Sequence, residues 1–398
     1  MRVRVRARVR VRARARVRAR VRARIRARIR ARIRARIRAR ACPRTRAPDR
    51  ASGSQRSRLL DRLTASSNSY PVKAPTGLFF ALTPDRVLAA VEEASIPTTG
   101  RCYLLGSLEN RVYDVEREDG IRVIAKFYRP GRWSTETILD EHRLLAALAE
   151  DEIPAIAPLP FPDGRTLHEM EDGIRFALFP KASGRSPEDM SLDDFRQIGR
   201  LLGRIHNVSS ASRLKHRPEL SPRTYGEDCL ARILALTNMP AGVRGRFESA
   251  AKNLIDLSRD LFRGAETFVL HADCHRGNLL RGREGFFFLD FDDMASAPPV
   301  QDLWLLLPAR PSDCPLERDA LIEGYETFRP FDFGSLRLVE ALRGLRYLRY
   351  AAWIAERFHD PAFPRAFPQF GTAAYWEGLL ADIYDQIRLL DADAGRFV

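Results

Sequence analysis

Two acidic residues, each downstream of a short apolar run, constrain the fold of this chain more than any other feature. Asp273 follows the apolar run 268–270, and Asp290 follows the run 286–289. Runs of this length and composition are typical of buried strands. We expect the two strands to form a rigid, hairpin-like base that carries both carboxylates into one cleft.

The residues at this spacing suit phosphoryl transfer from ATP. Asn278 lies five positions after Asp273, and Asp290 lies seventeen positions after it. Phosphoryl transfer uses one carboxylate to orient the attacking hydroxyl and to accept its proton. It also uses a carbonyl oxygen and a carboxylate to hold Mg²⁺ on the phosphates. The set therefore predicts a phosphotransferase active site.

Two other interpretations of this segment are weaker. The His-x-x-Cys-His pattern at 271–275 could belong to a metal site, but no further zinc ligands follow at regular spacing. An acidic residue after an apolar run is often a loop or helix-cap residue, and Asp290 alone would be assigned that role. Its spacing from Asp273 and Asn278 favours catalysis.

The net charge of +16 arises entirely from the N-terminal segment. Residues 1–50 contain 23 Arg and one acid, a charge of +22, so the rest of the chain carries −6. A mildly acidic globular part does not indicate a general DNA- or RNA-binding surface. We therefore expect no nucleic-acid partner for that part.

An arginine repeat fills the start of the chain. Every even position from Arg2 to Arg40 is Arg, alternating with Val, Ala or Ile. Alternation is formally a strand pattern, but like charges along one face oppose compact folding. Three interpretations stay open: a nucleic-acid or membrane-surface arm, a disordered tail, and a mis-assigned start in which a tandem DNA repeat is translated. The last is favoured, and residues 1–74 are left out of the fold prediction.

Cysteine usage and hydropathy indicate a cytoplasmic protein. Five scattered cysteines without paired spacing suit free thiols in a reducing compartment. No apolar run approaches the length that spans a bilayer, and the N-terminus lacks the apolar segment of a secretory signal. We expect no membrane partner, and we expect a monomer.

Residues 75–180 are predicted to form a smaller lobe of one or two helices and several strands. A helix begins near Thr83, and strands flank a polar turn that contains Gly106, Ser107 and Asn110. Backbone N–H groups and a hydroxyl in such a turn could contact phosphate oxygens. Taken alone this signal is weak, because many hairpin turns have similar composition.

A lysine in an apolar strand needs an acidic partner. Lys126 lies in the apolar run 122–128, where an unpaired ammonium would be costly. The next predicted helix, with Ser134 as its N-cap, presents Glu141 on the same face as Ile138. A strand lysine paired with a helix glutamate is the kinase arrangement that positions ATP phosphates. We expect both residues in the nucleotide site, in preference to two unrelated surface charges.

Residues 181–398 are predicted to form a larger, mostly helical lobe. The strand 174–180 before it suits a hinge between the lobes, and a helix with a capping-box-like start follows Ser191. A further helix begins at Val300, with Asp302 near its start. That carboxylate either favours the helix dipole or braces the catalytic loop, and the sequence does not decide between the two.

These motifs resemble the aminoglycoside phosphotransferase and choline kinase-like superfamily, whose signature is His-Gly-Asp-x-x-x-x-Asn followed by Asp-x-Asp. The resemblance covers roughly residues 82–387 and is strongest to its bacterial stress response kinase type. The runs that carry it lie at 107–113, 126–130, 271–278, 299–304 and 360–364. It implies an α+β, bilobal, protein-kinase-like fold with a small sheet-containing N-terminal lobe and a mostly helical C-terminal lobe.

The resemblance also implies roles for residues. Asp273 and Asp290 would be the active-site carboxylates, Asn278 and Asp290 the Mg²⁺ ligands, and Ser107 and Lys126 the ATP contacts. One departure is Ala272, where the family has Gly; we expect it to be a small steric change.

The implied activity is ATP- and Mg²⁺-dependent phosphorylation of protein Ser and Thr hydroxyls, including autophosphorylation, in a stress or protein-quality pathway. The alternative is a small-molecule phosphotransferase that acts on an aminoglycoside, a choline-like compound or a sugar alcohol, because one fold supports many acceptors. A third alternative, an inactive nucleotide-binding protein, is disfavoured because Lys126, Asp273, Asn278 and Asp290 are all present.

Overall fold

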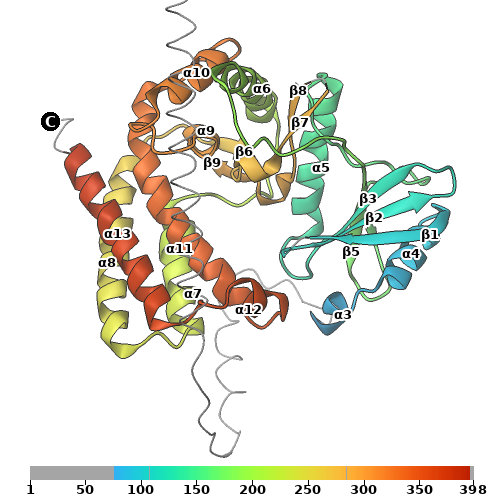
Figure 1. Ribbon diagram of the computed structural model, residues 1–398, viewed down its shortest axis with the longest axis horizontal. Helices are drawn as coiled ribbons and strands as arrows, with labels where there is room; N and C mark the ends of the chain where they lie inside the picture. Colours follow the sequence, from blue (N-terminus) through green and yellow to red (C-terminus); the bar gives the residue numbers. More distant parts are fainter. Residues whose placement is uncertain (1–75, 107, 284, 395–398) are drawn as a thin grey trace, which may run out of the picture. The chain divides into compact units, whose positions relative to one another are not determined.

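The computed structural model describes residues 76–106, 108–283 and 285–394, which belong to one compact unit, Tyr70–Val398. A small antiparallel sheet precedes a larger helical region along the chain (Figure 1). The predicted α+β, bilobal, kinase-like fold is confirmed. The arginine-rich segment 1–74 lies outside the described residues, and the predicted lobe boundary at 180/181 stays a prediction.

The smaller lobe is built on a five-stranded antiparallel sheet of order β1-β2-β3-β5-β4. Two helices pack against one face of the sheet, and Phe79, Val91 and Val115 are among the side chains that fill this part of the core. The elements are α3 (Thr76–Phe80), α4 (Pro84–Glu93), β1 (Thr98–Leu105), β2 (Arg111–Arg117), β3 (Arg122–Phe127), β4 (His168–Glu169) and β5 (Arg175–Pro180).

Helix α5 (Thr135–Glu150) joins the sheet to the helical lobe (Figure 1). It begins where predicted, because the Ser134 hydroxyl accepts a hydrogen bond from the Thr137 backbone N–H at 3.2 Å. The predicted inward face is buried, and it includes both Ile138 and the charged Glu141. The apolar residues of this face pack in the same core as those of α6 (Leu192–Ala211) and of the segment 269–291, which contains Asp273 and Asp290.

The larger lobe contains two helical groups. Helices α6 and α10 (Pro315–Glu326) pack closely, since a Cβ at Gly199 would lie 2.1 Å from the Leu321 carbonyl oxygen. A second core joins α7 (Asp228–Leu236), α8 (Ala241–Phe262), α11 (Val339–Arg357) and α13 (Ala373–Ala394). The short helices α9 (Val300–Trp304) and α12 (Ala362–Ala366) complete the lobe. Within the described residues, no helix is both long and apolar enough to cross a membrane.

The strands that precede Asp273 and Asp290 are present, but the predicted hairpin-like pairing of the two is wrong. Strand β6 (Phe268–Leu270) pairs with β9 (Ala295–Ala297), whereas β7 (Leu279–Gly282) pairs with β8 (Gly285–Phe288). Strand β7 is the nearer partner for β8, because only two residues separate the two strands in sequence and closing so short a connection costs little entropy. The two carboxylates predicted to be catalytic therefore follow strands of two different small sheets.

Candidate active site

The segment between β6 and β7 holds Asp273 and Asn278 together. The Asn278 side-chain N–H donates to the Asp273 carbonyl oxygen at 3.0 Å. The Leu289 backbone N–H, next to Asp290, donates to the Asn278 carbonyl oxygen at 2.8 Å. These bonds link the loop that carries Asp273 to the residue before Asp290. They, and not the predicted pairing of the two strands, bring the motif residues together.

Asp302 braces the loop that carries Asp273. Its carboxylate is fully buried and accepts hydrogen bonds from the backbone N–H groups of His271, at 3.1 Å, and Ala272, at 2.8 Å. The His206 ring nitrogen Nε2 lies 3.2 Å from the same carboxylate. Of the two roles that the sequence left open for Asp302, the structure shows the brace.

The backbone at Ala272 corrects the expectation of a small steric change. Its φ is 65°, in the left-handed region, where glycine is unstrained and other residues cost roughly 1–2 kcal/mol. Asp302 holds the Ala272 N–H, and the Gln301 side chain donates to its carbonyl oxygen at 2.8 Å. The family glycine is therefore explained by conformation, and these hydrogen bonds hold the alanine in the same shape.

Asp302→Asn is expected to lower the free energy of unfolding by about 3 kcal/mol, because it leaves buried backbone donors facing an amide in place of a carboxylate. Urea denaturation of the full chain measures this. Asp391→Asn, at an exposed position on α13, is the matched control and should change stability by less than about 0.5 kcal/mol. A similarly small change for Asp302→Asn would contradict the bracing role.

Lys126 of β3 and Glu141 of α5 form a buried ion pair. The Lys126 Nζ lies 3.2 Å from Glu141 Oε1, and the two residues are 7% and 1% exposed. Burial alone would lower the pKa of Lys126, but the carboxylates of Asp292 and Glu141 raise it well above its ordinary value. The lysine is therefore charged at neutral pH, with a fixed orientation.

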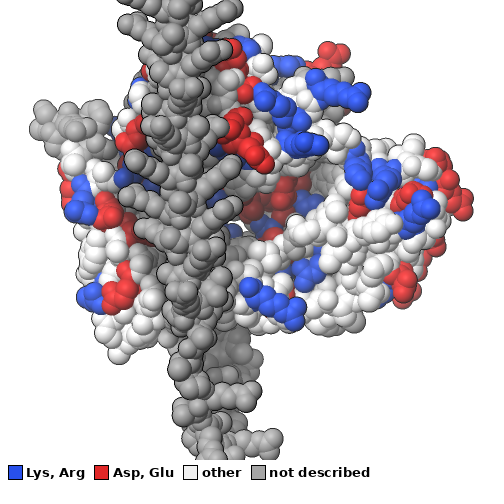
Figure 2. Space-filling model, viewed as in Figure 1, with Lys and Arg blue, Asp and Glu red and all other residues white. Residues whose placement is uncertain are grey.

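The same ammonium group faces the second acidic run. Its distances to Asp290 Oδ1 and Asp292 Oδ1 are 3.4 Å and 3.3 Å. Asp290 has a left-handed φ of 58° and a side chain that is 57% exposed, whereas Asp292 is 2% exposed. Asp290 is thus the carboxylate that a ligand in the cleft can reach, and Figure 2 shows acidic side chains gathered in a hollow on this face.

Asp292 is held by cations. Arg132 forms ion pairs with both Asp292 and Asp293, and the Asn110 side-chain N–H donates to Asp292 Oδ2 at 3.2 Å. Burial alone would raise the pKa of Asp292, but Arg132 and Lys126 hold it well below its ordinary range. This network connects the β1–β2 turn to the acidic run.

Asp273 lies between two basic side chains. Arg346 of α11 donates to Asp273 Oδ1 at 2.7 Å, and the His275 Nε2 lies 3.3 Å from Asp273 Oδ2. Burial alone would raise the pKa of Asp273, but the hydrogen bond from His275 and the charge of Arg346 hold it well below its ordinary range. The carboxylate is therefore ionised at neutral pH.

The predicted site residues divide into those the structure brings together and one it does not describe. Lys126, Glu141 and Asp290 converge on one ammonium group, and Asp273 and Asn278 are joined through the loop. Ser107 lies outside the described residues. Its neighbours Glu109 and Asn110 are described and belong to the same turn.

The donors at Asn278 and Asp290 suit a Mg²⁺ ion. The Asn278 side-chain amide nitrogen is used in the loop, which leaves the side-chain amide oxygen of Asn278 as a hard ligand, and the Asp290 carboxylate is exposed. Among the described residues, no group of three or more His, Cys, Asp or Glu side chains could hold a metal without help. Mg²⁺ commonly takes only one or two protein ligands and completes its shell with phosphates and water.

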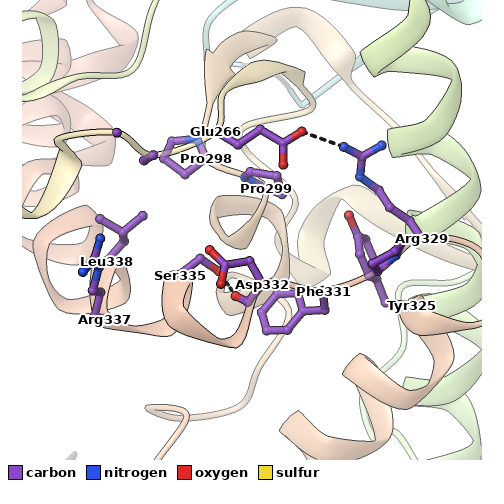
Figure 3. Close-up of a pocket in the computed structure, with 13 residues that line it drawn as sticks. Glu266, Pro298, Pro299, Tyr325, Arg329, Phe331, Asp332, Ser335, Arg337 and Leu338 are labelled. Carbon is purple, nitrogen blue, oxygen red and sulfur yellow. Dashed lines mark hydrogen bonds and ion pairs between the residues drawn. The ribbon is translucent and has the colours of Figure 1, made fainter. Parts of the chain in front are cut away.

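A separate pocket is lined by residues just before β6, just after β9, and at and after the end of α10 (Figure 3). Its polar groups are already engaged: Arg329 pairs with Glu266 at 2.9 Å, and Asp332 accepts from the Gly334 N–H at 2.8 Å. Its described lining contains none of the predicted site residues. The pocket is therefore not part of the candidate active site.

Three residues that contact the predicted site residues or their neighbours could not be assigned from the sequence. Asp292 had a signal, since it completes the Asp-x-Asp motif, but its burial did not follow from the pattern. Arg132 had a weaker one, as a cation just before the α5 N-cap. Arg346 had none, because α11 contains four arginines and only packing selects the one at Asp273.

Comparison with known sequences matches residues 103–339 to the family described as the phosphotransferase enzyme family. Stress response kinase A of Escherichia coli (strain K12) is 37% identical over 313 residues, which cover 78% of this chain and 94% of that protein. The serine/threonine protein kinase RdoA of Salmonella typhimurium (strain LT2) is 35% identical over 320 residues, with the same coverage.

Solved structures share the fold. The amicoumacin kinase hAmiN, in complex with AMP-PNP, Ca²⁺ and Ami, superposes with a TM-score of 0.61 at 19% identity and covers 76% of this chain and 93% of that one. A microcompartment-associated aminopropanol kinase gives a TM-score of 0.57 at 19% identity, with 77% and 97% covered. The chain therefore belongs to the phosphotransferase enzyme family and, within it, to the group of the stress response kinase A proteins.

Proposed function

We propose that this phosphotransferase is an ATP- and Mg²⁺-dependent kinase of protein Ser and Thr hydroxyls that acts in the cytoplasm. The observation that carries the proposal is the convergence of the Lys126–Glu141 pair with Asp290 on one side, and the junction of Asp273 with Asn278 on the other. This combination matches the parts that phosphoryl transfer requires.

Each side chain has a distinct task. Lys126, fixed by Glu141, neutralises the phosphates of ATP. Asp273, ionised and oriented by Arg346, binds the acceptor hydroxyl and takes its proton as the bond to phosphorus forms. The β1–β2 turn, which includes Ser107 and Asn110, lies against the phosphates through backbone N–H groups.

Mg²⁺ would be held by Asn278 and Asp290. When bound, the ion neutralises the charge that develops on the phosphate oxygens. The amicoumacin kinase of the same fold was obtained with an ATP analogue and a divalent cation, which supports this assignment for the cleft. Asp290 suits the role because its carboxylate is exposed next to the lysine that pairs with it.

The surroundings of Asp273 favour a protein acceptor over a cationic small molecule. An aminoglycoside or a choline-like acceptor carries positive charge, and at Asp273 it would meet the guanidinium of Arg346, which pairs with that carboxylate. Like charges at such distances cost binding energy. A neutral Ser or Thr side chain has no such penalty. The relative from Salmonella typhimurium (strain LT2) that is named a serine/threonine protein kinase points in the same direction.

The acceptor class is tested with purified full-length protein. With Mg-ATP alone, a protein kinase is expected to gain phosphate on its own Ser or Thr side chains, which intact-mass spectrometry detects as added mass. A generic protein substrate and a panel of aminoglycosides and amino-alcohols complete the experiment. Transfer to the panel, with no self-phosphorylation and no transfer to protein, would establish the small-molecule alternative instead.

A further inference from the structure

Two residues that have no part in the proposed chemistry, but that belong to runs carrying the family resemblance, meet in the structure. Arg129 lies in the run 126–130, and Asp360 begins the run 360–364. The Arg129 Nη2 donates to Asp360 Oδ2 at 2.8 Å, and the residues are 7% and 1% exposed. Asp360 is oriented in turn by the Ala362 backbone N–H at 3.0 Å. A buried pair between residues 231 positions apart ties the sheet to the C-terminal helices.

The Arg129 side chain also binds backbone groups of the β1–β2 turn. Its Nε donates to the Glu109 carbonyl oxygen and its Nη2 to the Leu108 carbonyl oxygen, both at 2.9 Å. Its own backbone N–H donates to the Asn110 side-chain oxygen at 3.2 Å. One guanidinium thus fixes two successive peptide groups of the turn, and Asp360 fixes the guanidinium.

A second anchor reaches the same turn from α11. The Trp353 indole N–H donates to Glu109 Oε2 at 2.5 Å, and Arg357 Nη2 donates to Glu109 Oε1 at 3.0 Å. Arg346, which holds Asp273, lies on this helix as well. Helix α11 is continuous from Val339 to Arg357, with a rise of roughly 1.5 Å per residue. It therefore connects Asp273, the proposed catalytic base, to the β1–β2 turn through one rigid element.

We propose that the α11–α12 region is the positioning element of the nucleotide site, and that Asp360, Trp353 and Arg357 act through Arg129 and Glu109 to hold the β1–β2 turn in its ATP-binding shape. The inference rests on the proposed function, since it takes the turn as a phosphate contact. Among the described residues, these anchors come from the helical lobe or are aligned by it. They act together with Arg132, whose Nε lies 3.4 Å from Glu109 Oε1, and with Asp292, which accepts from the Asn110 side chain. Nucleotide affinity therefore depends in part on residues that do not touch the nucleotide.

A positioning role and a purely structural role differ in the Michaelis constant for ATP. Trp353→Phe removes the hydrogen bond to Glu109 but keeps an aromatic ring beside Tyr350, with which the indole stacks at 5.6 Å. It is expected to raise KM for ATP about three- to tenfold while kcat changes less than about twofold, because the loss affects ground-state binding. Asp360→Asn is expected to raise KM for ATP by about tenfold or more. This variant tests the contact between Asp360 and Arg129.

Trp376→Phe is the matched control. Trp376 is fully buried in the helical core, and its indole N–H has no hydrogen-bond partner in the described structure. This variant should lower the melting temperature without changing KM for ATP. Calorimetric titration of Mg-ATP into each full-length variant gives an independent dissociation constant.

The possible outcomes distinguish failure of the positioning element from failure of the proposed function. Raised KM and raised dissociation constant in Trp353→Phe and Asp360→Asn, with Trp376→Phe unchanged, support the positioning element. Lower melting temperatures with wild-type KM in both variants overturn it and leave the proposed function standing. A wild-type protein that binds no Mg-ATP overturns the proposed function and this inference with it.

Discussion

Asp273→Asn is expected to reduce the rate of phosphate transfer by about three orders of magnitude, because the amide cannot accept the hydroxyl proton and no longer orients the hydroxyl. The substitution keeps the shape of the side chain. It also leaves Asn278 free to donate to the backbone carbonyl of residue 273, as it does at 3.0 Å in the wild type. Single-turnover measurements with saturating Mg-ATP isolate this step from product release.

Nucleotide affinity is the control within this experiment. Asp273 is assigned to the hydroxyl and not to the metal, so calorimetric titration should give a wild-type dissociation constant for Mg-ATP. Asp256→Asn, at a surface position on α8 with a 65% exposed side chain, should leave both quantities unchanged. Retention of more than about a tenth of the wild-type rate by Asp273→Asn would exclude general-base catalysis by this residue.

Local structure could be predicted because short-range chemistry decides it. Ser134 and Ser191 cap their helices through the hydrogen bonds that the sequence indicates, and the apolar face of α5 is buried with Glu141 among its members. The Lys126–Glu141 contact followed from a simple cost argument, since a buried ammonium requires a carboxylate. These inferences needed only neighbours in sequence or one strand and one helix.

Long-range pairing could not be predicted in the same way. The strands before Asp273 and Asp290 were recognisable, but their partners depend on which segments compete for each edge, and β7 and β9 were not foreseen. The conformation of Ala272 was hidden for a similar reason. Its left-handed φ is imposed by hydrogen bonds from Asp302 and Gln301, about thirty positions away along the chain.

The contacts of α11 illustrate the same limit within the site. Four arginines lie on this helix, and the sequence treats them alike. Only the packing of the helix against the cleft makes Arg346 the partner of Asp273 and Arg357 the partner of Glu109. Sequence reasoning therefore identified the groups assigned to the chemistry and the Glu141 partner of Lys126, whereas the contacts of Arg346 and Arg357 became visible only in three dimensions.

Asp290→Asn is expected to weaken Mg-ATP binding and to lower phosphate transfer at fixed Mg²⁺ by about two orders of magnitude. The substitution removes the charge of a hard oxygen ligand while keeping its size. Asp290 is 57% exposed, so folding should be little affected and the loss can be assigned to the site. Calorimetric titration of ATP at several Mg²⁺ concentrations is the direct measurement.

The dependence on Mg²⁺ gives this prediction its sharpest form. If Asp290 holds the ion, raising Mg²⁺ should restore part of the lost affinity in Asp290→Asn by mass action, while the wild type is already saturated. Asp260→Asn, with a 75% exposed carboxylate that pairs only with its helix neighbour Arg263 among the described residues, should follow the wild-type curve. Wild-type affinity and turnover in Asp290→Asn would instead mean that Asp290 has a structural role and that the metal is held elsewhere in the cleft.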